Sequence, residues 1–349
     1  MSLFPYEWTL SDGYPSSGIK KHGCSVFGTF ICGGGSTMGY KLAGFNHLGG
    51  VEIDPQVADI YKTNHNPKYL YVDDIRRFND RDDLPEELYN LDMLDGSPPC
   101  SSFSMSGNRE DDWGKNKQFR EGQTKQKLDD LVYVYIDTIK KLQPKVALLE
   151  NVKGLIKGNA KVYAKKMKKL FEEAGYRVQV FLLNGASMGL PQRRERVFFI
   201  GLRNDFHIPP ITLSFNDTPI TYNDIKSDEL GRQLTVETTK LWSRRKPTDR
   251  SLSHIHKRET GVAKRFNAVF VNGPETPQTL CAGADSIPIR HDYPNRITNK
   301  ECCLIGSYPT DYDFNKVEPN YLIGMSVPPV MTAQISNQIY NQWLKKIVK

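Results

Sequence analysis

Several familiar patterns are missing from this sequence, and each absence argues against a class of protein. None of the six cysteines forms a C-x-x-C pair, so a zinc ribbon or a thioredoxin-type site is a weak interpretation. No apolar run approaches the length needed to span a bilayer, and the N-terminal stretch shows no basic-then-apolar signal pattern. No G-x-G-x-x-G is present, which argues against a dinucleotide cofactor. We therefore expect a cytoplasmic protein that uses no metal.

Length and charge set wider bounds. The 349 residues are enough for one large domain and a smaller one, and 38% apolar residues can support a hydrophobic core. The net charge of +7 and the isoelectric point of about 8.9 lean toward a polyanionic partner. Many enzymes with neutral substrates are equally basic, so charge alone leaves nucleic acid and other partners open.

The first two hundred residues alternate between β-rich apolar runs and helical patterns. This alternation predicts a parallel sheet of the doubly wound type. The predicted strands are 25–31, 49–54, 91–96, 145–150, 177–183 and 196–202, and two of the predicted helices are 127–142 and 160–176. Composition then shifts toward Pro, Thr, Asn, Arg and His over 204–295, which indicates a smaller module of β or irregular structure. The tail is helical again, with one face expected to carry Ile335, Ile339, Trp343 and Ile347.

A glycine-rich turn stands between the first predicted strand and the helix after it, in "FICGGGSTMGYKLAGF". Glycines at such a turn let a ligand approach the backbone N–H groups. Glu52 ends the next strand and could accept hydrogen bonds from ribose hydroxyls, and Asp74 could accept one from an adenine amino group. This layout favours an adenosine cofactor, although a glycine-rich turn alone occurs in other α/β proteins.

Cys100 follows a predicted strand in "DGSPPCSSFSMSG". Two prolines fix φ at successive positions and stiffen the turn before the thiol. The polar segment 104–126 is expected to be a mobile loop that could close over a substrate. By itself this stretch is also consistent with a buried structural cysteine.

Glu150 and Asn151 end the next strand, which should bring them near Cys100. A partly desolvated carboxyl group at that place can hold a raised pKa and protonate a ring nitrogen. Arg194 and Arg196 alternate before another strand, so both could reach one site. An inert salt bridge between Glu150 and an arginine is the competing interpretation.

Together, these segments resemble the DNA (cytosine-5) methyltransferase family of bacterial and phage type, which uses S-adenosylmethionine. Six segments match family motifs in order: "FICGGG…AGF", "GSPPCSSFS", "ENV", "QRRERVFFIG", "RITNKE" and "IGMSVPP". The resemblance implies an α/β fold with a doubly wound mixed sheet of the class I methyltransferase type and an inserted, smaller target-recognition domain. It places the catalytic and cofactor-binding domain at 1–203 and 318–349, and the target-recognition domain at 204–317.

The family's residue roles carry over to matching positions in this chain. The implied catalytic residues are Cys100, Glu150, Arg194 and Arg196. The implied cofactor contacts are Phe30, Gly33, Gly34, Gly35, Glu52, Ile53, Asp74, Ile75, Pro98 and Ser326. The expected DNA contacts are Ser101, Ser104, Arg244, Arg245 and Lys257, with Lys246, His254, His256 and Arg258 as further candidates that could equally provide general phosphate attraction.

Four departures from the family pattern stand at Cys32, Asp73, Ser101 and Met325, where the family usually has Gly, Gly, Gln and Asn. Two other functions stay open: a tRNA cytosine-5 methyltransferase, whose Cys-Phe-Thr signature we do not find, and a catalytically silent DNA-binding protein of the same fold. We expect a monomer that acts on double-stranded DNA by base flipping, away from membranes, as part of a restriction–modification system or as a solitary enzyme.

Overall fold

The computed structural model describes residues 2–15, 18–99, 131–156, 160–283 and 286–348, together with two short strands, β5 (Asn116–Lys117) and β6 (Gln126–Lys127). They form two compact units. The sheet unit comprises Gly18–Leu183, Glu195–Ser214 and Thr332–Lys349, and the second unit comprises Met1–Ser17, Asn184–Arg194 and Phe215–Met331. Cys100, Ser101 and Ser104 lie outside the described residues.

A seven-stranded sheet in the order β3-β2-β1-β4-β7-β9-β8 forms the centre of the sheet unit. The strands are β1 (Ser25–Thr29), β2 (Asn46–Glu52), β3 (Tyr69–Val72), β4 (Met93–Gly96), β7 (Val146–Val152), β8 (Tyr176–Asn184) and β9 (Glu195–Arg203). The first five strands across the sheet are parallel, whereas β9 runs antiparallel to β7. The mixed sheet expected from the resemblance is confirmed, and the all-parallel sheet expected from alternation alone is wrong at β9.

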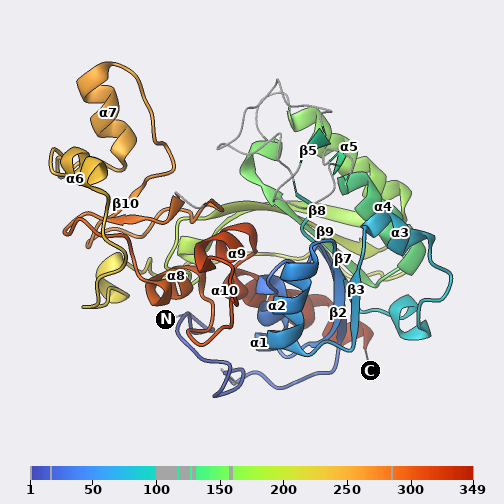
Figure 1. Ribbon diagram of the computed structural model, residues 1–349. Coiled ribbons are helices and arrows are strands. Elements are labelled where there is room, and N and C mark those ends of the chain that lie inside the picture. Colours follow the sequence, from blue (N-terminus) through green and yellow to red (C-terminus); the bar gives the residue numbers. More distant parts are fainter. Residues whose placement is uncertain are drawn as a thin grey trace. The chain divides into compact units, whose positions relative to one another are not determined.

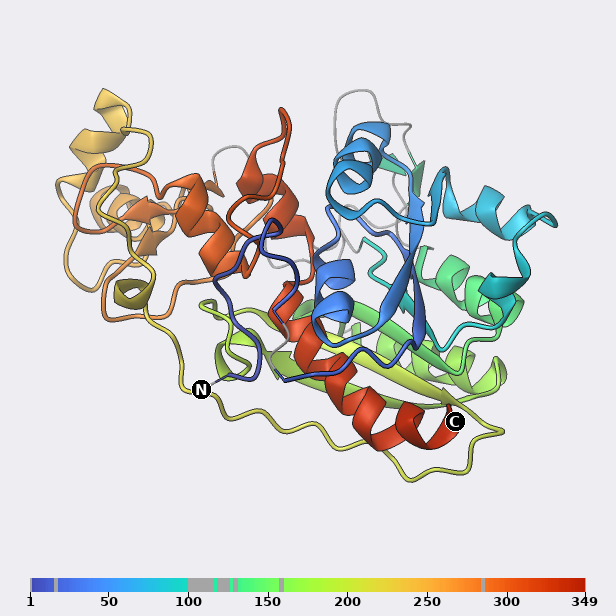
Figure 2. The ribbon, with the colours of Figure 1, turned by 90° about the horizontal axis from the view of Figure 1, so that it is seen from below.

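Helices cover both faces of this sheet. Figure 1 shows α3, α4 and α5 together on one face, and Figure 2 shows the C-terminal helix running along the other. The helices are α1 (Gly35–Leu42), α2 (Pro55–His65), α3 (Ile75–Asp80), α4 (Leu131–Leu142), α5 (Ala160–Glu173), α10 (Pro329–Ile339) and α11 (Lys345–Ile347), with short 3₁₀ segments at Glu86–Tyr89 and Lys153–Ile156. The ring of Tyr340 stacks on His22, which fixes the C-terminal helix to the segment that leads into β1.

The main core lies between the sheet and helices α3, α4 and α5. The amphipathic pattern of α4 explains its place there, because the apolar residues that recur at helical spacing are the ones it buries. Buried residues of this cluster include Phe27, Val51, Phe78, Leu94, Tyr135, Ile139, Leu149, Phe171 and Phe199. A core of this kind holds the carboxyl ends of the parallel strands at one edge, where ligands bind in open α/β sheets.

The second unit is mostly irregular, with short helices. Its elements are 3₁₀ segments at Gly185–Ser187 and Tyr222–Asp224, the helices α6 (Val236–Trp242), α7 (Leu252–Thr260), α8 (Asn299–Gly306) and α9 (Pro319–Met325), and the strands β10 (Phe270–Val271) and β11 (Ile289–Arg290). A buried network organises it: Glu301 accepts a 2.7 Å hydrogen bond from the Tyr222 hydroxyl and caps α8 through Thr298. Arg290 lies 3.9 Å from the same carboxylate.

The two compact units divide the chain differently from the domains expected from sequence. The second unit takes in the N-terminal segment, Asn184–Arg194 and the stretch up to Met331 in addition to most of 204–317. Long-range contacts explain this, since Trp8 donates to the carbonyl of Ser307 and Gln192 donates to the carbonyl of Ile305. The domain bounds at 203/204 and 317/318 stay a prediction about function, because compactness and recognition need not follow the same residues.

Candidate functional site

Glu150 on β7 and Arg196 on β9 form an ion pair near the carboxyl end of β7. Arg196 Nε lies 3.0 Å from Glu150 Oε1, and both side chains are largely buried, with 14% and 10% of their surfaces exposed. The register explains the contact, because Glu150 pairs with Phe198 and Arg196 stands two residues before Phe198 on the same face of β9. The ion pair that the competing interpretation named is therefore present, and the catalytic role of Glu150 stays a prediction.

The Pro-Cys turn begins at the end of β4, beside the end of β7. Gly96 pairs with Leu149, the residue before Glu150. Asn151 donates from Nδ2 to the carbonyl of Pro98 at 3.4 Å, which ties the start of the turn to the strand that carries Glu150. The described residues therefore continue to Pro99, directly before Cys100, and Pro98 is held by the residue after Glu150. Cys100 itself lies outside the described residues.

The glycine-rich turn after β1 has the left-handed backbone that such a turn requires. Gly34 has φ +75°, and Phe30 and Cys32 also have positive φ, at 58° and 47°. Left-handed backbone is unfavourable for a residue with a Cβ, so Cys32 keeps the conformation for which the family uses glycine. Gly34 is further restricted, because a Cβ there would lie 2.2 Å from Nε2 of His65.

Glu52 closes this turn from the neighbouring strand. Its Oε2 accepts from the N–H of Cys32 and its Oε1 from the N–H of Asp54, both at 2.9 Å. Burial raises the pKa of Glu52, and these backbone hydrogen bonds oppose the rise. A carboxylate has about four lone-pair positions, so Glu52 can still accept from a ribose.

Asp74 caps α3 beyond the next strand. Its side chain accepts from the N–H of Arg76 at 2.8 Å and pairs with the guanidinium of the same residue. Ile75, which follows it, is buried. The glycine turn, Glu52 and Asp74 therefore follow or end the neighbouring strands β1, β2 and β3 at their carboxyl ends.

Asp95 was not among the candidate residues expected from sequence. It stands one residue before the end of β4 with only 4% of its surface exposed, and burial raises the pKa of its carboxyl group to about 7, with the charge of Glu150 adding to the rise. The sequence does show an acid after the apolar run before "GSPPC". The residue that hydrogen-bonds this acid, Tyr40, is distant in sequence, so the local pattern does not reveal its burial.

Arg194 and Ser326 belong to the second unit. The guanidinium of Arg194 is buried and donates to the carbonyls of Leu280, Gly324 and Ser326 at 3.3, 3.0 and 2.8 Å. The hydroxyl of Ser326 accepts from Tyr308 at 2.7 Å. Arg194 therefore joins three backbone segments of this unit.

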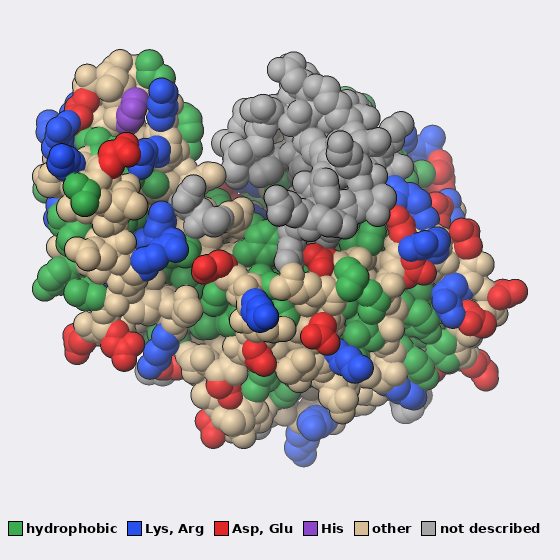
Figure 3. Space-filling view, viewed as in Figure 1, with side chains coloured by type: hydrophobic (Ala, Val, Ile, Leu, Met, Phe, Trp, Pro, Cys, Tyr) green, Lys and Arg blue, Asp and Glu red, His purple; other side chains and the backbone are tan. Residues whose placement is uncertain are grey.

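The cations expected to contact DNA lie in and around α6 and α7, where Figure 3 shows several Lys and Arg side chains mixed with acidic ones. Arg245 lies over the ring of Trp242 at 3.3 Å and donates to the carbonyl of His291. Arg258 holds both carboxylate oxygens of Asp249. Exposed residues include Arg244, Lys246, His254 and Lys257. Two exposed apolar side chains in the loop after α7, Val262 and Phe266, were not among the candidates expected from sequence.

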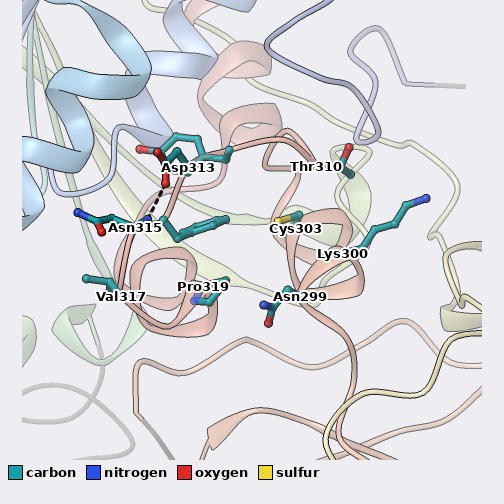
Figure 4. A pocket seen from close by; sticks show the side chains of 10 residues that line it. Asn299, Lys300, Cys303, Thr310, Asp313, Asn315, Val317 and Pro319 are labelled. Atoms are coloured by element: carbon teal, nitrogen blue, oxygen red, sulfur yellow. Dashed lines mark hydrogen bonds between the residues drawn. The ribbon is translucent and has the colours of Figure 1, made fainter.

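A pocket of about 310 Å³ also lies in the second unit, between α8 and the loop that precedes α9 (Figure 4). Asn299, Lys300 and Cys303 line it from α8, and Asp313 accepts from the N–H of Asn315 across from them. Burial raises the pKa of the Cys303 thiol to about 12, so this cysteine stays protonated. Of the described residues expected to be catalytic, Glu150, Arg194 and Arg196 do not line this pocket.

The fold and the strand-end groups define an α/β methyltransferase of the class I type. The family model for C-5 cytosine-specific DNA methylases matches residues 26–341. The chain therefore belongs to the C-5 cytosine-specific DNA methylase family. Within the described residues, no helix combines the length and apolarity needed to cross a bilayer, and no group of three or more His, Cys, Asp or Glu could hold a metal ion.

Two methyltransferases and a solved structure that are similar to this chain agree with the family assignment. The chain is 38% identical over 182 residues to the Type II methyltransferase M.FnuDI of Fusobacterium nucleatum, which covers 51% of this chain and 47% of that protein. It is 25% identical over 338 residues to the Type II methyltransferase M1.HphI of Haemophilus parahaemolyticus, with 89% and 85% covered. A solved structure of a Spodoptera frugiperda DNMT2 variant matches in fold, with a TM-score of 0.64 and 16% identity over 91% of this chain and 99% of that one.

Proposed function

We propose that the protein transfers a methyl group from S-adenosylmethionine to C5 of a flipped-out cytosine in a specific double-stranded DNA sequence. The observation that carries the proposal is the Glu150–Arg196 pair, which stands beside the strand end that leads to Cys100. The glycine turn, Glu52 and Asp74 at the same edge of the sheet support a place for the cofactor. S-adenosylmethionine supplies an electrophilic methyl group.

In the proposed reaction, C5 of cytosine first has to become nucleophilic. The thiolate of Cys100 adds at C6, which makes C5 enamine-like. Glu150 hydrogen-bonds or protonates N3, so that negative charge does not build up on the ring, and Arg196 binds the O2 side. After C5 takes the methyl group, loss of the C5 proton and expulsion of Cys100 restore the ring.

The ion pair gives both residues a defined orientation before the base enters. Arg196 Nε lies 3.0 Å from Glu150 Oε1, so the guanidinium orients the carboxylate that would face N3. Removing either partner from a largely buried pair leaves an uncompensated charge. Arg194 makes three hydrogen bonds to backbone carbonyls in the second unit, and we propose that it serves the reaction by holding that backbone rather than by touching the base.

The other proposed cofactor contacts are Phe30 at the adenine, the Gly33–Gly35 backbone, Ile53, Ile75 and Pro98. Ser326 stays a proposed contact from the last motif, through a hydroxyl group that already accepts from Tyr308. Ser101 and Ser104 stay proposed DNA contacts outside the described residues.

DNA recognition is proposed for the cations near α6 and α7. Arg244 and Lys257 are exposed and can reach phosphates, whereas Arg245 is partly buried against Trp242 and fits a positioning role better. Extrusion of the cytosine costs on the order of a few kcal/mol, which phosphate contacts would offset. The exposed ring of Phe266, beside Lys264 and Arg265, adds an apolar group that could stack on a base.

A mechanism-based trap tests the proposal. Duplex DNA that carries 5-fluorocytosine should form a covalent adduct with the protein in the presence of S-adenosylmethionine, because fluorine at C5 blocks the final elimination. Cys100→Ser should form no adduct, and Cys303→Ser serves as the matched control that keeps it. If no duplex DNA that carries 5-fluorocytosine in place of cytosine gives an adduct, the proposed function is wrong.

Bisulfite sequencing of DNA from cells that express the protein would identify the methylated sequence. Methyl transfer to DNA but not to tRNA in vitro would exclude the tRNA alternative. Resistance of that DNA to a restriction endonuclease of the same specificity would support a role in restriction–modification, and elution at 39.7 kDa would support the expected monomer.

A further inference from the structure

Asp95 contacts both flanks of the glycine-rich turn, through its backbone carbonyl on the β1 side and through its buried carboxyl group on the α1 side. Before the turn, the hydroxyl of Thr29, the last residue of β1, donates to the carbonyl oxygen of Asp95 at 3.0 Å. After the turn, the side chain of Ser36, in the first turn of α1, hydrogen-bonds the Asp95 carboxyl group. One helical turn further, the Tyr40 hydroxyl donates to Asp95 Oδ1 at 3.1 Å. One residue thus connects the two flanks of the segment 30–35.

Asp95 also lies on the same face of the sheet as Glu150. It pairs with Leu148 across the parallel β4–β7 ladder, and Glu150 follows Leu148 by two positions, so their side chains share a face. The chain continues from Asp95 through Gly96 to the Pro98 segment, which Asn151 holds. The same residue is therefore placed between the turn expected to bind the cofactor and the strand end expected to carry the nucleophile.

We propose that Asp95 is a positioning residue that fixes the cofactor turn in its binding conformation and sets it relative to the catalytic strand ends. The inference rests on the proposed function for the identity of the ligand. The left-handed residues of this turn explain why an anchor is needed, since Phe30, Cys32 and Gly34 hold a backbone that an unrestrained chain seldom adopts. Fixing that backbone before binding lowers the entropy that binding must otherwise offset.

A purely structural role is the competing explanation, and Asp92 shows what it looks like. Asp92 stands just before the opposite end of β4 and is also buried, at 7% exposed. It accepts from the N–H of Ser25 at 2.7 Å and pairs with Lys145 at 2.6 Å, far along the strand from the turn. It therefore provides a matched control: a buried aspartate directly before the same strand, whose loss should affect stability alone.

The experiment compares Asp95→Ala, Asp95→Asn, Tyr40→Phe and Asp92→Asn in the full-length chain. The first readout is the affinity for S-adenosylhomocysteine by calorimetry. The second is hydrogen exchange of the amides in 30–36 without any cofactor, which reports the turn itself. The third is methyl transfer by the unmodified chain, which tests the proposed function separately.

Asp95→Ala should weaken binding about tenfold or more, the equivalent of losing one or two buried hydrogen bonds, and should speed exchange in 30–36. Asp95→Asn keeps an acceptor for Tyr40 and should bind nearly normally. Tyr40→Phe removes one donor and should weaken binding by a smaller factor, and its effect should largely vanish in the Asp95→Ala background.

Asp92→Asn should lower the unfolding temperature without changing either readout. If Asp95→Ala, or Tyr40→Phe where Asp95→Ala does not fold, behaves like Asp92→Asn, the inference is overturned. If the unmodified chain shows neither cofactor binding nor methyl transfer, the proposed function fails, while the exchange data still decide whether Asp95 anchors the turn.

Discussion

Replacing Asp95 with asparagine should make folding stability less sensitive to pH. Burial raises the pKa of Asp95 from 3.8 to about 7, and the nearby charge of Glu150 adds to it, while hydrogen bonds from Tyr40 and Ser36 act in the opposite direction. The folded chain therefore holds this proton more tightly than the unfolded chain does. The stabilising contribution is greatest below about pH 4 and is lost as the pH rises toward 7.

The magnitude follows from these two pKa values. Between pH 5 and pH 8 the unfolded carboxyl group is ionised throughout, whereas the folded one loses its proton, which lowers the free energy of unfolding by about 2.5 kcal/mol. Asparagine has a similar shape and does not titrate. The difference in unfolding free energy between Asp95→Asn and the unmodified chain should therefore grow by that amount in favour of the variant from pH 5 to pH 8.

Urea unfolding at pH 5, 6, 7 and 8, followed by far-UV circular dichroism, measures this difference. Tyr40, Tyr61 and Tyr135 also face Asp95, but burial raises their pKa values above 10, so they do not titrate in this range. Glu150 is present in both proteins. A difference that stays constant from pH 5 to pH 8 would refute the reasoning, because it would mean that Asp95 is already ionised in the folded chain at pH 5.

Other substitutions test separate features of the site and the second unit. Cys32→Gly should raise the free energy of unfolding by up to about 1 kcal/mol, because φ of +47° favours glycine; a lower unfolding temperature would contradict this. Arg196→Met should destabilise the chain by roughly 3 kcal/mol by leaving Glu150 buried without its partner, and adding Glu150→Gln should recover part of that loss; full additivity of the two changes would argue against the pair. Lys257→Ala should reduce the slope of log affinity for DNA against log salt by about 1 with unchanged stability. Arg258→Ala should instead lower the unfolding temperature, because it breaks the ion pair with Asp249. A lower unfolding temperature for Lys257→Ala and a smaller salt slope alone for Arg258→Ala would contradict both assignments.

Local patterns predicted six of the seven strands of the sheet at about their observed places, whereas β3 (Tyr69–Val72) was not predicted. The direction of β9 could not be obtained this way, because a strand buried on both faces has the same composition in either direction. The tail shows a second limit. Ile335, Ile339 and Trp343 are buried as expected. A π-helical segment at Tyr340–Leu344 then changes the helical spacing, and Ile347, which follows it, is only partly buried.

The candidate site was predictable where a residue's neighbours follow from strand register. Glu150 and Arg196 are an example, since both stand at strand ends with apolar runs that fix their faces. Asp95 was not predictable in this way, because its properties depend on Tyr40, which is 55 residues away in sequence. A raised pKa arises from burial by distant segments, and no local pattern records it.

Finally, the close contact between Gly34 and His65 restricts how this turn can change. Any side chain at position 34 would meet the imidazole ring at 2.2 Å, and the backbone there already has φ +75°. A side chain at position 34 would require His65 to move or to be smaller, and it would still meet Tyr61 at 3.0 Å on a left-handed backbone. The two positions are therefore expected to vary together among related chains, with the change at the end of α2 coming first, even though 31 residues separate them in sequence.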